Sequence, residues 1–233
     1  MNQLTSKFVL QLRFWFLFIC LNFNLSTNAQ TFINFESGAL FTSINDIRNG
    51  NNGTLFSLKN DFPTSVSPFL RLRAGFLING EHYFSFLYAP LKIIESGIRE
   101  NNILFDEKDF KANLPIEVVY KFNSYRFTYN RRIIIKDNFK FGMGLSAKIR
   151  DAGVSLKNKE LLSENFSIGF VPLVNLLANY DLSQKMGIDF FGEGIIASKG
   201  RAIDISLSGR YILTENLQAN IGYRLLEGGA DGT

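Results

Sequence analysis

The chain is poor in the residues that carry most enzyme and metal chemistry. Its 233 residues include one cysteine, Cys20, and one histidine, His82. Because Cys20 lies in the first 29 residues, the rest of the chain can form no disulfide and run no thiol chemistry. His82 lacks a local triad-like arrangement of serine or aspartate, and a lone histidine without cysteine argues against a transition-metal site. We therefore assign no catalytic, cofactor-binding or metal-binding residue, and we expect His82 to be an ordinary interfacial histidine.

A strong excess of one charge is also absent. The sequence holds 25 basic and 21 acidic residues, and two of the basic ones, Lys7 and Arg13, lie in the first 29 residues. The remaining chain is therefore close to neutral. It contains no nucleic-acid-binding motif, so we expect no nucleic-acid partner.

After residue 29, no stretch has the composition of a long apolar helix. Before it, an uninterrupted apolar run at 14–21 follows Lys7 and Arg13 and precedes a polar stretch that ends at Ala29. This basic, apolar, polar order is typical of a secretory signal peptide, which we place at residues 1–29. The run is shorter than the roughly 20 residues of a membrane-spanning helix, although a retained anchor is the alternative. Lipid attachment at Cys20 is not expected, because Ile19 before it is not a small residue.

What is present from residue 30 onward is an alternation of apolar and polar residues between turn residues, which predicts β-strands. The clearest case is 139–150, where apolar residues such as Leu145 alternate with polar or small ones such as Ser146. Asn79-Gly80 is a tight hairpin signal. In all, nine strands are predicted, at 31–42, 69–77, 82–93, 118–134, 139–150, 167–182, 186–197, 202–213 and 217–226.

The links between these strands favour one architecture. Short links near Asn79, Asp137, Gln184 and Glu215 alternate mostly with long polar ones, at 46–54, 94–115 and 151–165. Short turns at one end and longer loops at the other are typical of outer-membrane barrels, whose lipid-facing strands and aromatic girdles also suit the 24 Phe and 8 Tyr here. We predict that 30–233 forms an all-β, antiparallel, up-and-down transmembrane β-barrel. A soluble secreted β-sandwich is the less favoured alternative.

The strand count carries a further expectation. Bacterial barrels have an even number of strands, so nine visible strands predict about ten in the full protein. We expect the C-terminal strand to be missing from this sequence.

The polar faces of the strands carry many charges. If those faces line a barrel, the charges form a lumen-facing network, because interior charges must be paired or hydrated. A barrel of about ten strands leaves little free space, which favours a filling role over an anion-attracting conduit or ligand pocket. The predicted members are Glu36, Arg71, Arg73, Arg126, Lys140, Lys148, Arg150, Asp189, Glu193, Asp204, Arg210 and Arg224.

Two loop segments offer candidate binding features, each with an ordinary structural alternative. The acidic residues of 95–107 could hold calcium, but their spacing matches no EF-hand, so we expect a solvated loop. Phe62, Pro63 and Pro68 could form a binding surface, although packing of a loop over the barrel rim explains them equally well.

Several motifs resemble those of an uncharacterised family of small Gram-negative outer-membrane β-barrel proteins. They are YAPL at 88–91, YKFNSYR at 120–126, GFVPL at 169–173, GRAID at 200–204 and GYRLLEGGAD at 222–231. The resemblance implies a fold and a location but no established activity. Members of that family continue past the last motif into one more strand with an aromatic end, and this chain departs from them there.

The sequence thus predicts a porin-like, non-enzymatic protein of the bacterial outer membrane with a structural, narrow-permeation or surface-binding role. Its expected partners are outer-membrane lipid and, during biogenesis, the barrel-assembly machinery; a ligand cannot be named. An outer-membrane lipid-modifying enzyme is the second functional class, and the absence of a rim histidine argues against it.

Overall fold

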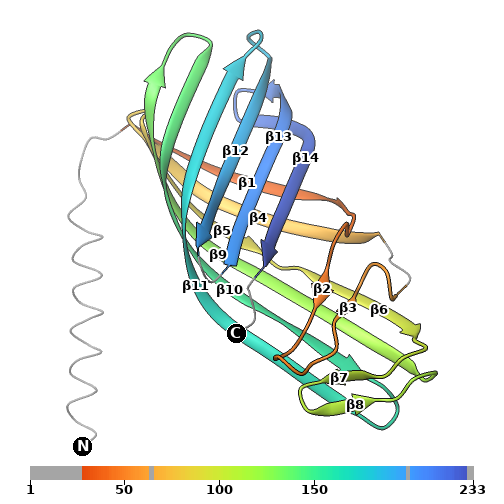
Figure 1. Ribbon diagram of the computed structural model, residues 1–233. Coiled ribbons are helices and arrows are strands. Elements are labelled where there is room, and N and C mark those ends of the chain that lie inside the picture. Colours follow the sequence, from red (N-terminus) through yellow and green to blue (C-terminus); the bar gives the residue numbers. More distant parts are fainter. Residues whose placement is uncertain (1–27, 63–65, 198–199, 230–233) are drawn as a thin grey trace, which may run out of the picture.

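The computed structural model describes residues 28–62, 66–197 and 200–229. The described part is built from antiparallel strands without helices, and most of them form one sheet that curls into a half-barrel (Figure 1). No helix in this part is long and apolar enough to cross a membrane. The predicted signal peptide falls almost wholly on residues 1–27, which lie outside the described residues, as do Pro63 and the last four residues.

The main sheet follows the order of the chain. In space, the strands run β1 (Ala29–Leu40), β4 (Ser67–Ile78), β5 (His82–Ala89), β9 (Pro115–Ile135), β10 (Phe139–Lys157), β11 (Leu162–Asp181), β12 (Met186–Ala197), β13 (Gly200–Thr214) and β14 (Leu217–Gly229). A further strand, β6 (Lys92–Ile98), pairs with β9 beyond the end of β5. The predicted all-β, antiparallel, next-neighbour architecture is confirmed, and each of the nine predicted strands matches one position in this order.

Local chemistry explains two features of the sheet. Asn79 and Gly80 both have positive φ, 52° and 72°, as a two-residue hairpin of the predicted kind requires. Pro90 has no N–H to donate to a sheet ladder, and the pairing with β9 is interrupted between Ala89 and Lys92. β5 and β6 therefore act as one broken strand.

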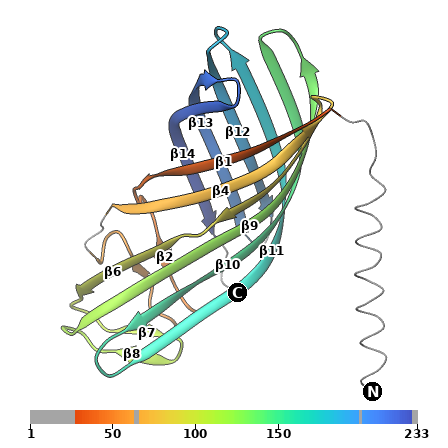
Figure 2. The same cartoon turned by 180° about the vertical axis from the view of Figure 1, so that it is seen from behind.

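The two ends of the half-barrel differ. The four short links that follow β4, β9, β11 and β13 share one end, which we call the turn end. At the other end, the cap end, two small hairpins pack on the sheet (Figures 1 and 2): β2 (Asp46–Ile47) pairs with β3 (Phe56–Ser57), and β7 (Ile103–Phe105) pairs with β8 (Lys108–Phe110).

Two predicted long loops are corrected by these elements. The segment 94–115 contains most of β6 and the β7–β8 hairpin, and 151–165 is mostly strand, because β10 continues to Lys157 and β11 starts at Leu162. Conspicuous polar residues in both segments favour loops in the sequence, whereas the strands continue with their apolar side chains turned to the other face.

The main hydrophobic core lies at the cap end. It joins the link between β1 and β4, the β7–β8 hairpin and the inner face of β9 and β10. We call it the cap cluster, and its members are Ile47, Phe56, Leu58, Phe62, Ile103, Phe105, Phe110, Ile116, Val118, Val154 and Leu156. The packing of Phe62 over the sheet agrees with the rim-packing alternative for that residue.

Large apolar side chains also cover the convex face of the sheet, where no other described residue packs over them. Leu145 is 66% exposed while its neighbour Ser146 is 3% exposed, so their predicted facing on β10 is confirmed. Similar exposure along β1, β11 and β14, for example at Phe35, Phe170 and Ile221, extends the apolar surface around the half-barrel.

Candidate functional site

The concave face holds a cluster of buried ion pairs centred on Asp204 of β13. One carboxylate oxygen of Asp204 accepts hydrogen bonds from Arg71 at 3.1 Å and from Arg126 at 2.6 Å, and the other accepts one from Arg224 at 2.5 Å. Asp204 is 2% exposed and Arg126 is 1% exposed. Three guanidinium groups therefore converge on one desolvated carboxylate.

Two glutamates complete this ion-pair cluster. Glu193 of β12 pairs with Arg126, and Glu36 of β1 accepts two hydrogen bonds from Arg224, at 2.7 and 2.9 Å. Arg71 also lies 3.5 Å from Glu36. The cluster thus contains three arginines and three carboxylates, so its formal charges balance.

The cluster spans the concave side of the sheet. Its members come from β1, β4, β9, β12, β13 and β14, and β4 and β9 are not neighbours of β13 in the sheet. Side chains from such distant strands can meet only across the concave side. The bidentate contact between Glu36 and Arg224 joins the two edge strands, β1 and β14, which are not paired with each other by backbone hydrogen bonds.

The other predicted network residues lie outside this cluster, and none of them is exposed. Near the turn end, Lys140 pairs with Asp181 at 3.1 Å, and Arg210 pairs with both Asp181 and Asp189. The predicted list missed Asp181, although its place on the polar face of its strand was visible in the sequence.

Three of the predicted network cations have no carboxylate partner among the described residues. Arg73 bonds the Ser85 hydroxyl and lies 4.9 Å from the Phe191 ring centroid. Lys148 lies 4.8 Å from the Phe122 ring, and Arg150 bonds only the Ser167 hydroxyl. Aromatic faces stabilise such cations, but these residues do not join the ion-pair cluster.

A second polar group fills the space between the cluster and the turn end. Asn130 donates to Asn175 at 2.8 Å, and Asn175 donates to the Ser146 hydroxyl at 3.1 Å, which also contacts Thr128. All four are at most 3% exposed. The sequence placed Ser146 and Asn175 on polar faces but carried no signal that these uncharged residues would meet.

His82 lies apart from both groups. Its Nδ1 is 3.0 Å from the Tyr129 hydroxyl and the two rings are stacked, next to Phe84 at the turn end. These rings form an aromatic cluster on the apolar convex face. No group of His, Cys, Asp or Glu able to hold a metal ion occurs in the described ranges. Within 95–107, Arg99 instead pairs with Asp61 at 3.3 Å.

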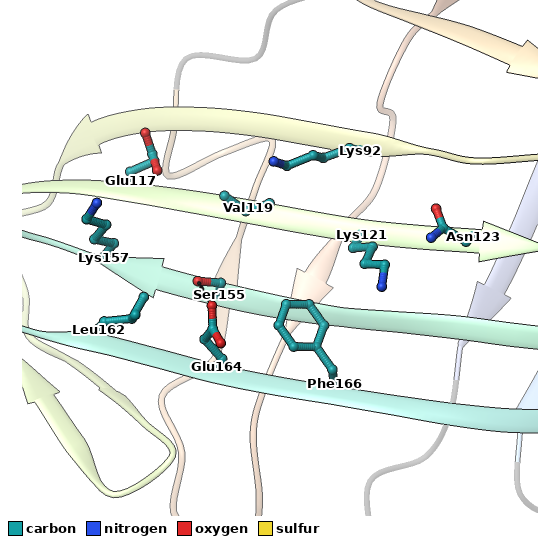
Figure 3. A pocket seen from close by; sticks show the side chains of 10 residues that line it. All are labelled: Lys92, Glu117, Val119, Lys121, Asn123, Ser155, Lys157, Leu162, Glu164 and Phe166. Atoms are coloured by element: carbon teal, nitrogen blue, oxygen red, sulfur yellow. Dashed lines mark hydrogen bonds between the residues drawn. The ribbon is translucent and has the colours of Figure 1, made fainter.

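A shallow hollow of about 530 Å³ lies on the convex face at the cap end (Figure 3). It is formed by side chains of β6, β9, β10 and β11. Lys121 contacts Asp151 at 2.7 Å, and its hydrogen bond holds the pKa of the Asp151 carboxyl below its ordinary value. The hollow lining is Lys92, Glu117, Val119, Lys121, Asn123, Ser155, Lys157, Leu162, Glu164 and Phe166.

Comparison with protein-family models and with curated proteins finds no match for the chain.

Proposed function

We propose that this protein is an integral outer-membrane β-barrel protein with a structural, narrow-permeation or surface-binding role and no enzymatic activity. The observation that carries the proposal is a reversal of the hydrophobic face along single strands. On β10, Leu145 and Ile149 are exposed on the convex face, but further along Val154 and Leu156 are buried on the concave face. A strand in one environment keeps its apolar residues on one face.

β9 shows the same reversal. Phe127 is 53% exposed on the convex face, whereas Ile116 and Val118 are buried in the cap cluster. A change of surroundings explains this pattern: lipid outside and polar side chains inside at the turn end, then water outside and an apolar core inside at the cap end. On both strands, the apolar side chains change from the convex to the concave face beside the contact between Lys121 and Asp151.

Dimensions support the same interpretation. The convex apolar stretch of β10 from Phe141 to Ile149 covers roughly 27 Å of strand, or about 20 Å along the axis of a barrel with tilted strands, close to the roughly 25 Å apolar band of such barrels. β9, β10 and β11 have 21, 19 and 20 residues, about twice the length that a bilayer requires. Their excess length supports the cap cluster.

The resemblance to small Gram-negative barrels fits this proposal. Residues 1–29 would direct export and be removed, and the barrel-assembly machinery would insert the chain into the outer membrane. The turn end would then face the periplasm and the cap end the exterior.

In a bilayer, backbone groups at the two free edges of the described sheet, on β1 and β14, would lack hydrogen-bond partners. Successive positions alternate in direction, so the edge strands β1 and β14 run the same way. A strand running antiparallel to both would pair both edges, which lipid cannot hydrate. The bilayer experiments below therefore use a closed form, in which one alternating apolar–polar strand is fused after Thr233.

A matched pair of substitutions tests the membrane proposal. Leu145 lies within the convex apolar band and Leu162 lies beyond it, and they are 66% and 49% exposed. In lipid vesicles, Leu145→Arg should lower the free energy of unfolding of the closed form by about 2–4 kcal/mol, and Leu162→Arg by no more than about 1 kcal/mol. Urea titrations read by gel mobility before and after boiling measure both. Equal effects would contradict the membrane assignment, because a sheet standing in water exposes both leucines alike.

The filled interior predicts little conduction. The ion-pair cluster occupies the concave side, and the cap cluster lies across its outer end. Planar-bilayer recordings of the closed form should therefore show no large stable pore. A steady conductance typical of wide porins would rule out the filling role and favour a diffusion channel.

A further inference from the structure

The hollow on the convex face has the features of a binding site for an anionic headgroup. Its three lysines come from three strands: Lys92 from β6, Lys121 from β9 and Lys157 from β10 (Figure 3). Between them lie the short side chains of Val119 and Ser155, which leave the space open.

Two of these lysines are free to bind. Lys121 is held by Asp151 and lies 5.5 Å from the Phe166 ring centroid. The side-chain ammonium groups of Lys92 and Lys157 form no hydrogen bond or ion pair with another described residue, and both residues are exposed. An anion that bridges the strands would therefore gain charge-assisted hydrogen bonds without breaking existing pairs.

The other residues that line the hollow suit a ligand with hydroxyl groups and an apolar face in addition to an anionic group. Glu164 accepts a weak hydrogen bond from Ser155 at 3.5 Å, and Glu117 has no partner in the described part. Carboxylates accept hydrogen bonds from hydroxyl groups but repel a second negative charge. Phe166, 45% exposed, offers a flat apolar surface at the rim. A sugar that carries phosphate supplies hydroxyls, an apolar ring face and an anion together.

The position of the hollow indicates that this sugar belongs to a lipid. In the sheet register, Asp151 lies opposite Ile168, and Ile149 opposite Phe170. Ile168 and Phe170 are 77% and 68% exposed, so the apolar band begins immediately beside the hollow. An amphiphile could place its headgroup in the hollow and its acyl chains along the band.

We propose that this hollow binds the phosphorylated sugar headgroup of a membrane glycolipid, with Lys92 and Lys157 as the phosphate ligands. The proposal rests on the proposed function, since it needs the band beside the hollow to be in contact with lipid. It adds to that function a specific lipid partner on the exterior side.

The test uses the full chain folded in detergent micelles and diphosphorylated lipid A as the probe. The double variant Lys92→Gln/Lys157→Gln should bind it at least about tenfold more weakly than the parent chain, since each lost charge-assisted bond is worth roughly a factor of ten. The matched control, Lys136→Gln/Lys185→Gln, removes the same charge from exposed positions near the turn end. It should bind like the parent. Circular dichroism verifies that both variants keep their strands.

Two comparisons complete the experiment. Enzymatically dephosphorylated lipid A should bind the parent chain as weakly as the double variant binds the intact lipid, and millimolar inorganic phosphate should not compete. Equal affinities for the two double variants, or for the two lipids, would overturn the proposal, and effective competition by phosphate would overturn its lipid part. If the Leu145→Arg and Leu162→Arg pair behaves as expected while these measurements fail, only the headgroup site is wrong; if that pair also fails, the membrane assignment falls with it.

Discussion

Replacing Asp204 with alanine is expected to lower the free energy of unfolding by about 3–5 kcal/mol, the usual cost of removing one partner from a buried ion pair. Asp204 is 2% exposed and receives hydrogen bonds from Arg71, Arg126 and Arg224. Without it, three guanidinium groups share only Glu36 and Glu193. The unfolded state loses nothing comparable, because water hydrates the arginines there. Urea titration of the full chain in detergent micelles, followed by circular dichroism, measures the effect.

A surface pair provides the control. Asp109 is 41% exposed at its side chain and pairs with Lys111 two residues away, so Asp109→Ala should cost no more than about 1 kcal/mol. The double variant Asp204→Ala/Arg224→Met should recover part of the loss, because it also removes one of the stranded cations. If Asp204→Ala costs no more than Asp109→Ala, the ion-pair cluster is hydrated and does not hold the sheet in its curved form.

Phe105→Ala is the other substitution with a large expected effect. Phe105 is 1% exposed in the cap cluster, and its ring meets that of Phe56 edge to face with centroids 6.3 Å apart. Truncation of a buried phenylalanine costs about 3–5 kcal/mol through lost burial and the remaining cavity. Because the cap cluster stands apart from the ion-pair cluster, we expect the loss to appear mainly as local opening of the cap.

Limited proteolysis and amide hydrogen exchange distinguish local from global effects. In the Phe105→Ala variant, the first long link around β2 and β3 should be cut and exchange faster, while β12 to β14 keep their protection. Leu55→Ala, at a residue 53% exposed beside Phe56, should leave the cap intact. Uniform loss of protection over the whole sheet would show that the cap does not unfold separately.

The alternation of residues predicted the sheet well because strand facing follows directly from period two. Leu145 and Ser146 point to opposite faces as the sequence required, and Asn79-Gly80 forms the expected turn. The change from apolar odd positions, such as Ile149, to apolar even positions, such as Val154, can be read in the sequence, but the sequence did not show that both stretches belong to one continuous strand. The burial of the cap-end residues depends on hairpins that are distant in the chain.

The partners within the polar face were equally hidden. The sequence placed Glu36 and Arg224 on inward faces, but their contact depends on how far the sheet curls, which no local pattern encodes. For the same reason, the sequence could not show that Asp204 has three arginine partners whereas Arg150, among the described residues, bonds only the Ser167 hydroxyl. The hollow at Lys92 and Lys157 was missed because its residues lie on three strands with no common motif.

The composition of the cap cluster has a consequence for the time course of folding. Its members come from three stretches of chain, 47–62, 103–118 and 154–156, so it can form only after long loops have closed. Contacts between residues far apart in sequence form slowly. Refolding should therefore show a late phase in which the sheet is already paired while Phe56, Phe105 and Phe110 still contact water. During that interval the chain can be captured by another copy of itself, so the yield of folded protein should fall as its concentration is raised.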